Sequence, residues 1–128
     1  MKLRKALIVN SKGNMDMEVY KEHTQELLRI ACSRYKVIPY SLSLMFDEVF
    51  SNDSMVEQKA REKVEQAVLE DMDLVIAFVE DDMSSEIETV IKRAAVMGKP
   101  VYPVRMSETD FLLGAVYAEE LYRTNYRG

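Results

Sequence analysis

Four short apolar runs rich in β-branched residues are separated along the chain by longer amphipathic segments. The runs cover residues 6–9, 36–40, 74–79 and 100–104. Continuous apolar runs with little polar alternation are typical of parallel strands that are buried on both faces. The pattern therefore predicts four parallel strands.

The segments between the runs show apolar residues at helical spacing. We predict helices over residues 16–33, 54–70 and 84–97, and a last helix from 107 through 122. The stretch 41–53 is the one longer connection without a regular pattern. Such loops often close over a site in this kind of fold.

Local signals mark two of the helix ends. Ser54 followed by Glu57 forms a capping box for the second helix, and Gly98 followed by Pro100 ends the third. The alternation of strands and helices with short connections predicts an α/β fold, a three-layer doubly wound arrangement with a mainly parallel sheet of four to five strands, flavodoxin-like or Rossmann-like. The length of 128 residues suits one domain, and we expect residues 1–128 to form it.

Charge and cysteine content narrow the classes of partner and compartment. The net charge of −5 offers no basic stripe for nucleic acid or an anionic membrane. A single cysteine, Cys32, cannot form an internal disulfide, which fits a reducing compartment. The first apolar run, 6–9, is too short for a signal peptide or a membrane span. We therefore predict a cytoplasmic protein that binds neither nucleic acid nor membrane.

The sequence contains no pattern for a metal site or a catalytic triad. One histidine and one cysteine cannot build a Cys/His cluster, and the acidic residues lack an EF-hand pattern. No motif connects the only histidine, His23, with a nucleophile. We expect no metal and no cofactor.

Ligands of an open parallel sheet bind beyond the carboxyl ends of the strands, which here are followed by residues 10–14, 41–53 and 80–85. In the first loop, Ser11, Lys12 and Gly13 either bind a phosphate or form a tight turn that needs the glycine backbone. The glycine spacing matches neither the P-loop nor the dinucleotide-binding fingerprint. We expect phosphate, if bound, against the helix starts at residues 11–14 or 84–85.

The third loop contains the most informative motif. Residues 82–88 read D-M-S-S-E-I-E, after an apolar strand opened by Asp73 and before a Gly-Lys-Pro-Val ending at 98–101. This arrangement resembles the nucleoside 2-deoxyribosyltransferase superfamily, which includes 2′-deoxynucleoside 5′-phosphate N-hydrolases. Asp82 and Glu88 match the two acids of the D-x-G-T-x-x-E motif of that family; Ser85 matches its threonine, and Ser84 stands at its glycine.

The resemblance implies an N-glycosidic transferase or hydrolase that acts on a 2′-deoxynucleoside or its 5′-monophosphate. Glu88 would attack C1′ of the sugar, Asp82 would hold the leaving base or supply its proton, and Glu65, eight residues before Asp73, would orient sugar or nucleophile. Further contacts to the substrate are implied for Ser11, Gly13, Tyr20, Ser84 and Ser85.

Structural roles remain open beside these catalytic ones. Ser85 and Glu88 also read as a capping box, Glu65 as a solvated acid, and Tyr20 as a packed tyrosine. Two other functions remain as alternatives: a non-catalytic nucleotide-binding or sensor module on the same fold, and a Toll/interleukin-receptor-type domain that cleaves NAD.

The last predicted helix favours self-association. Its small residues permit close approach of another helix, and they lie beside large apolar ones: Gly114, Ala115 and Ala118 beside Phe111, Tyr117 and Leu121. We predict a homodimer or a higher homo-oligomer. The resemblance also implies a site completed by a neighbouring subunit, with Asn125 or Tyr126 as the donor.

Overall fold

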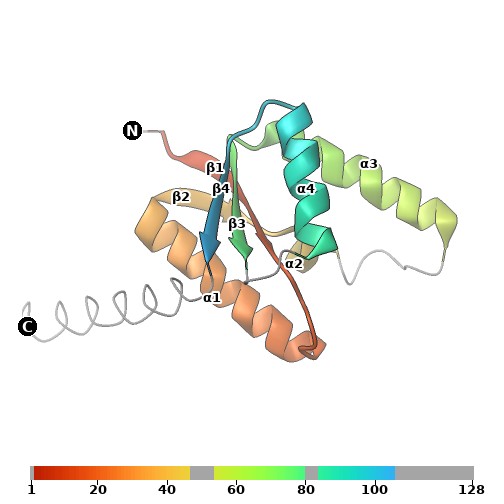
Figure 1. The fold of residues 1–128 in the computed structure, drawn as a ribbon, viewed down its shortest axis with the longest axis horizontal. Coiled ribbons are helices and arrows are strands. Elements are labelled where there is room, and N and C mark those ends of the chain that lie inside the picture. The colour runs from red at the N-terminus through yellow and green to blue at the C-terminus, as the bar shows by residue number, and fades with distance from the viewer. Residues whose placement is uncertain (1, 47–53, 80–83, 106–128) are drawn as a thin grey trace, which may run out of the picture.

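The protein is described by a computed structural model that covers residues 2–46, 54–79 and 84–105. The strands of this part are β1 (Arg4–Asn10), β2 (Val37–Tyr40), β3 (Leu74–Val79) and β4 (Val101–Arg105). The helices are α1 (Met17–Tyr35), α2 (Leu42–Phe46), α3 (Met55–Asp71) and α4 (Ser85–Val96). Figure 1 shows their arrangement.

The four strands form one parallel sheet in the order β2-β1-β3-β4. From β1 the chain passes through α1 to β2 on one side, and then returns through α3 to β3 on the other side of β1. The direction of winding therefore reverses between β1 and β3. In doubly wound sheets, this switch point is where the strand ends leave a crevice for ligands.

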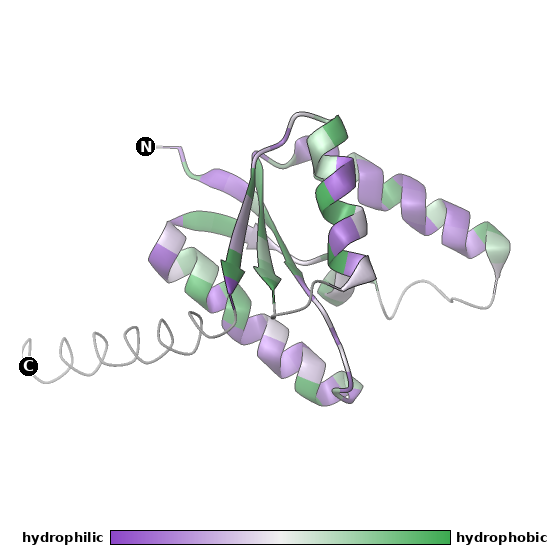
Figure 2. Cartoon of the chain, in the orientation of Figure 1, coloured by the Kyte–Doolittle hydropathy of each residue, from purple (hydrophilic) through white to green (hydrophobic). Residues whose placement is uncertain are grey.

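Helices cover both faces of the sheet, which gives the predicted three layers (Figure 1). On one face, α1 packs Leu27, Ile30 and Ala31 against β1 and β3. On the other, Leu69 of α3 and Ala94 of α4 pack against alternate strand residues. Figure 2 shows the hydrophobic strands enclosed between these helices, whose outer sides are largely hydrophilic. The predicted α/β fold is confirmed.

The central strand β3 is buried along its whole length, as its continuous apolar run predicts. Its start is aligned with β1 by two bonds: the Lys5 N–H donates to the Asp73 carboxylate at 2.8 Å, and the Asp73 N–H donates to the Lys5 carbonyl at 2.9 Å. The Lys5 ammonium donates to Asp71 at 3.0 Å. That hydrogen bond and the charge of Asp71 raise the pKa of Lys5.

The structure confirms some of the predicted helix ends and corrects others. Ser54 caps α3, since its hydroxyl accepts from the Glu57 N–H. The hydroxyl that caps α4 belongs to Ser84, which accepts from the Ile87 N–H at 3.3 Å. The capping box predicted from Ser85 is therefore wrong, because Glu88 lies one position too far along the helix to close it.

The structure corrects the prediction for the loop 41–53 and confirms the turn predicted at Gly13. The stretch that looked irregular contains the short helix α2, which was not predicted. Gly13 has a φ of +57° in a turn closed by the Met15 N–H and the Lys12 carbonyl, so the turn interpretation of this glycine is confirmed. The helix expected over 107–122 lies outside the described residues. No described helix is both long and apolar enough to cross a membrane.

Candidate functional site

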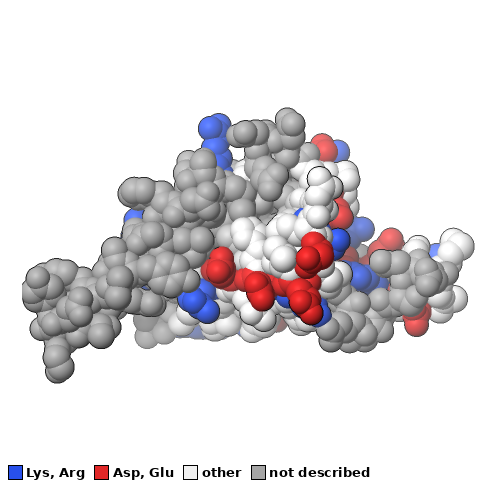
Figure 3. Space-filling model, turned by 90° about the horizontal axis from the view of Figure 1, so that it is seen from below, with Lys and Arg blue, Asp and Glu red and all other residues white. Residues whose placement is uncertain are grey.

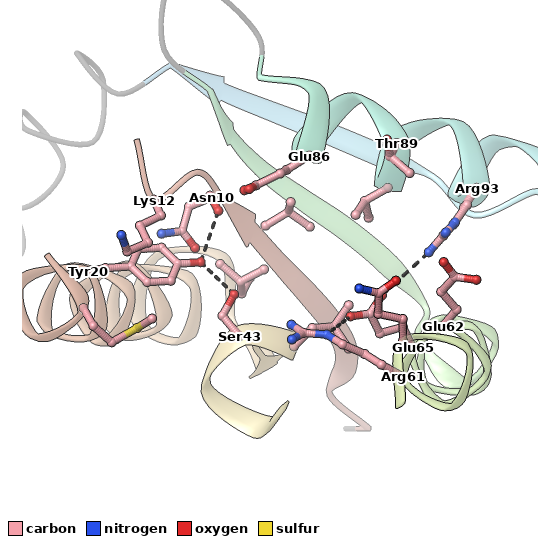
Figure 4. Close-up of a pocket in the computed structure, with 16 residues that line it drawn as sticks. Asn10, Lys12, Tyr20, Ser43, Arg61, Glu62, Glu65, Glu86, Thr89 and Arg93 are labelled. Carbon is pink, nitrogen blue, oxygen red and sulfur yellow. Dashed lines mark hydrogen bonds and ion pairs between the residues drawn. The ribbon is translucent and has the colours of Figure 1, made fainter. Parts of the chain in front are cut away.

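A pocket of about 610 Å³ opens at the carboxyl end of β1, next to the switch point of the sheet. The pocket is lined by the end of β1, the turn after it and one face of each of the four described helices (Figure 4). Its volume falls in the range of roughly 300–1,000 Å³ that is usual for small-molecule sites. Position and size both indicate a binding site for a small ligand.

A buried hydrogen-bond network forms one end of the pocket. The Tyr20 hydroxyl lies 2.7 Å from the Ser43 hydroxyl and donates, at 3.4 Å, to the Asn10 carbonyl. The Asn10 amide donates to Thr24 at 3.0 Å. Tyr20 is only 4% exposed because it lies on the inner face of α1. The network joins α1, α2 and the end of β1, so it holds this end of the pocket in one shape.

An ionic cluster forms the other end, where α3 meets α4. Glu65 accepts from the Arg61 Nε, one helical turn earlier on α3, at 2.7 Å. The Arg93 guanidinium, from α4, lies 3.7 Å from the second oxygen of Glu65. The Glu65 side chain is 19% exposed. Its position away from open solvent strengthens both interactions.

Glu86 extends into the pocket from the first turn of α4 (Figure 4). Thr89, Val90 and Arg93 line the pocket from the same helix face, at the three- and four-residue spacing of a helix. Glu88 lies two residues beyond Glu86, which turns its side chain about 200° around the axis.

Glu88 does not line the pocket. Its side chain is 54% exposed and pairs with Lys92 at 3.4 Å. The two glutamates of this segment thus differ in one respect: Glu86 lines the pocket and Glu88 does not, although both residues are exposed.

The other predicted site residues fall into two groups. Tyr20 and Glu65 line the pocket, from opposite ends. Ser11, Gly13, Ser84 and Ser85 do not line it; Ser84 caps α4 and Ser85 is exposed in the first turn of that helix. Asp82 lies outside the described residues.

The pocket residues that the sequence analysis missed include four with polar or charged side chains that bear on the site: Ser43, Arg61, Glu86 and Arg93. The four-residue spacing of Arg61 and Glu65 on one helix was a signal for one of them. The other three come together only through the packing of separate elements.

The charges around the pocket are mixed. Lys12, Arg61 and Arg93 bring three positive charges, and Glu62, Glu65 and Glu86 bring three negative ones. Figure 3 views the molecule from below Figure 1, the side on which α1 lies. Acidic side chains gather near the centre of that view. Among the described residues, no group of three acidic, histidine or cysteine side chains is placed to hold a metal ion.

Comparison with solved structures finds a protein with a similar fold. The chain is similar to a 2-deoxyribosyltransferase from the psychrotolerant bacterium Bacillus psychrosaccharolyticus, with a TM-score of 0.63 and 13% identity. The similarity covers 79% of this chain and 72% of the other. No protein-family model and no curated protein matches the sequence. At this identity the comparison shows a shared fold.

Proposed function

We propose that the protein transfers or hydrolyses the N-glycosidic bond of a 2′-deoxynucleoside or its 5′-monophosphate in this pocket. The observation that carries the proposal is the position of Glu86, a carboxylate at the start of a helix that faces the cavity at the switch point. The fold shared with a 2-deoxyribosyltransferase supports the class of reaction.

In the proposed reaction, one carboxylate oxygen bonds to C1′ of the sugar while the bond between C1′ and the base nitrogen breaks. The base leaves with a proton from an acid of the site, and a glycosyl ester remains on the protein. A second base or water then attacks C1′ and frees the carboxylate. Carboxylate nucleophiles of retaining glycosidases follow the same two displacements.

Two glutamates of α4 compete for the role of nucleophile. The spacing of the sequence motif favours Glu88, whereas the lining of the pocket favours Glu86. The proposal assigns the attack to Glu86 and keeps Glu88 as the alternative. Both lie in the first turn of the helix, where the positive end of the helix dipole stabilises a carboxylate anion. Asp82 keeps its proposed role as the partner of the leaving base.

The test measures free base released from the four 2′-deoxynucleosides, their 5′-monophosphates and NAD, separated by chromatography. Glu86→Gln should lower the rate on the best substrate by about 1,000-fold or more, because the covalent step loses its nucleophile. Glu88→Gln is the matched control on the same helix turn, and its rate should stay within about twofold of wild type. Both variants should melt as wild type does.

Each other outcome points to a stated alternative. A large loss in Glu88→Gln with full activity in Glu86→Gln would return the nucleophile to Glu88. Cleavage of NAD alone would favour the Toll/interleukin-receptor-type reaction. Binding of nucleotides without release of base from any substrate would refute the enzymatic proposal in favour of the binding module.

A further inference from the structure

The ionic cluster of Arg61, Glu65 and Arg93 is at the end of the pocket opposite Tyr20 (Figure 4). The reaction proposed above needs carboxylates near C1′, but it does not need two guanidinium groups. Since both arginines line the cavity, they face any ligand that fills it.

Glu65 does not hold the two guanidinium groups equally. Its carboxylate accepts from the Arg61 Nε at 2.7 Å, whereas the Arg93 guanidinium lies 3.7 Å from its second oxygen. Glu62 lines the same pocket. Arg93 is therefore the less tightly held of the two arginines.

Arg93 has more hydrogen-bond donors than Glu65 uses. A guanidinium carries five N–H donors, and a carboxylate has only two oxygens. Arg61 uses its Nε on Glu65 at 2.7 Å, whereas Arg93 stays at 3.7 Å, beyond a direct hydrogen bond. The donors of Arg93 are thus not consumed by Glu65. Its side chain is 39% exposed, so a ligand in the pocket can reach them.

We propose that Arg93, together with Arg61, binds the 5′-phosphate of a nucleotide in the pocket, and that Glu65 is a positioning residue that holds both guanidinium groups in place. The planar fork of arginine matches two phosphate oxygens at once, and partial burial strengthens such a pair. The choice of a nucleotide as the ligand rests on the proposed function, whereas the anion-binding role rests on the geometry of the cluster.

This assignment differs from the phosphate sites expected from the sequence. Those were the helix starts at residues 11–14 and 84–85. Of these, Lys12 lines the pocket, whereas Ser11 and Ser84 do not. The Ser84 hydroxyl is engaged in capping α4. The two guanidinium groups lie instead where α3 meets α4.

The test compares, by calorimetry at fixed ionic strength, the Kd of each 2′-deoxynucleoside 5′-monophosphate with that of its nucleoside. Wild type should bind the best monophosphate about tenfold or more tightly than the nucleoside, and inorganic phosphate should compete with it. Arg93→Gln should weaken the monophosphate by about 10- to 100-fold and leave the nucleoside unchanged. Arg61→Gln should act in the same direction.

Matched controls remove the same charge from the outer sides of the same helices. Lys92 on α4 and Lys63 on α3 do not line the pocket. The Kd of Lys92→Gln and of Lys63→Gln for the monophosphate should therefore stay within about twofold of wild type. If Arg93→Gln fails to fold, Arg93→Lys replaces it: this variant keeps the charge, loses the fork and should show an intermediate loss. Equal effects in the arginine variants and the lysine controls would overturn the proposal.

The positioning role of Glu65 has its own readout. Loss of a negative charge alone should tighten phosphate binding, whereas loss of positioning should weaken it. We expect Glu65→Gln to lower the preference for monophosphate over nucleoside without a change in melting temperature. An equal or higher preference would overturn the positioning role.

The two proposals fail in different ways. A preference for monophosphate that depends on Arg93, without release of base, would refute the glycosidic function and leave the phosphate site standing. Release of base at equal rates from nucleoside and monophosphate, in wild type and Arg93→Gln alike, would do the reverse.

Discussion

Removal of the Tyr20 hydroxyl tests whether the hydrogen-bond network at the Tyr20 end of the pocket joins α1 to α2. Tyr20→Phe keeps the buried ring and removes the group that lies 2.7 Å from Ser43 and 3.4 Å from the Asn10 carbonyl. The first contact is a short hydrogen bond and the second is near the distance limit.

The expected cost follows from these distances. A buried hydrogen bond contributes about 1 kcal/mol net, and the longer contact contributes less, so Tyr20→Phe should lower the free energy of unfolding by about 1–2 kcal/mol. For a chain of 128 residues, the entropy of unfolding converts this into a fall in Tm of about 4–7 °C. Ser43→Ala breaks the shorter bond from the other side and should cost about 1 kcal/mol.

A double-mutant cycle measured by urea unfolding, with circular dichroism as the signal, isolates the shared bond. Tyr20→Phe combined with Ser43→Ala should cost about 1 kcal/mol less than the sum of the single changes. Tyr102→Phe is the control, since this tyrosine is 49% exposed on β4, and its effect should stay below about 0.5 kcal/mol. Additive single effects would refute the inferred link between the two helices.

Two further predictions concern stability. Ser84→Ala should lower the free energy of unfolding by about 1 kcal/mol because it removes the cap of α4. Ser85→Ala should change it by less than about 0.5 kcal/mol. Urea unfolding measures both variants, and the opposite ranking would contradict the capping geometry. The pKa of Lys5 is raised above its ordinary value of 10.5 by the hydrogen bond and charge of Asp71, so its contribution to stability is complete below that value and is lost as the pH rises through the folded pKa. The difference in stability between wild type and Lys5→Met should therefore be constant from about pH 7 to 10 and shrink above that range, and a difference that grows there would contradict the pair.

The fold could be predicted largely from the sequence because its signals are local. The run 74–79 is apolar at every position, which is typical of a strand buried on both faces, and β3 has these bounds. The periodic segments likewise predicted α1, α3 and α4 to within about two residues, the usual uncertainty of helix ends. The helix α2 was missed because five residues are too few to show a helical period.

Adjacent residues of the same type limit what can be predicted from local sequence signals. Ser84 and Ser85 are equally good caps by composition, and only the structure shows that Ser84 is the cap. Which acid of α4 lines the cavity depends on where the neighbouring elements place the pocket. The sequence could identify the motif, but it could not decide whether Glu86 or Glu88 enters the pocket.

The site itself depended on contacts between elements far apart in the chain. Tyr20 and Glu65 were predicted and line the pocket, but the partners that define their surroundings, Ser43 and Arg93, were not. Glu65 meets Arg93 because the sheet order β2-β1-β3-β4 brings α3 and α4 to the same face, beside the end of β1. By itself the sequence determined the elements, their order and their buried sides, since these follow from local periodicity. Only tertiary packing decided which polar side chains share the cavity, because that depends on strand order and on how each helix is turned about its axis.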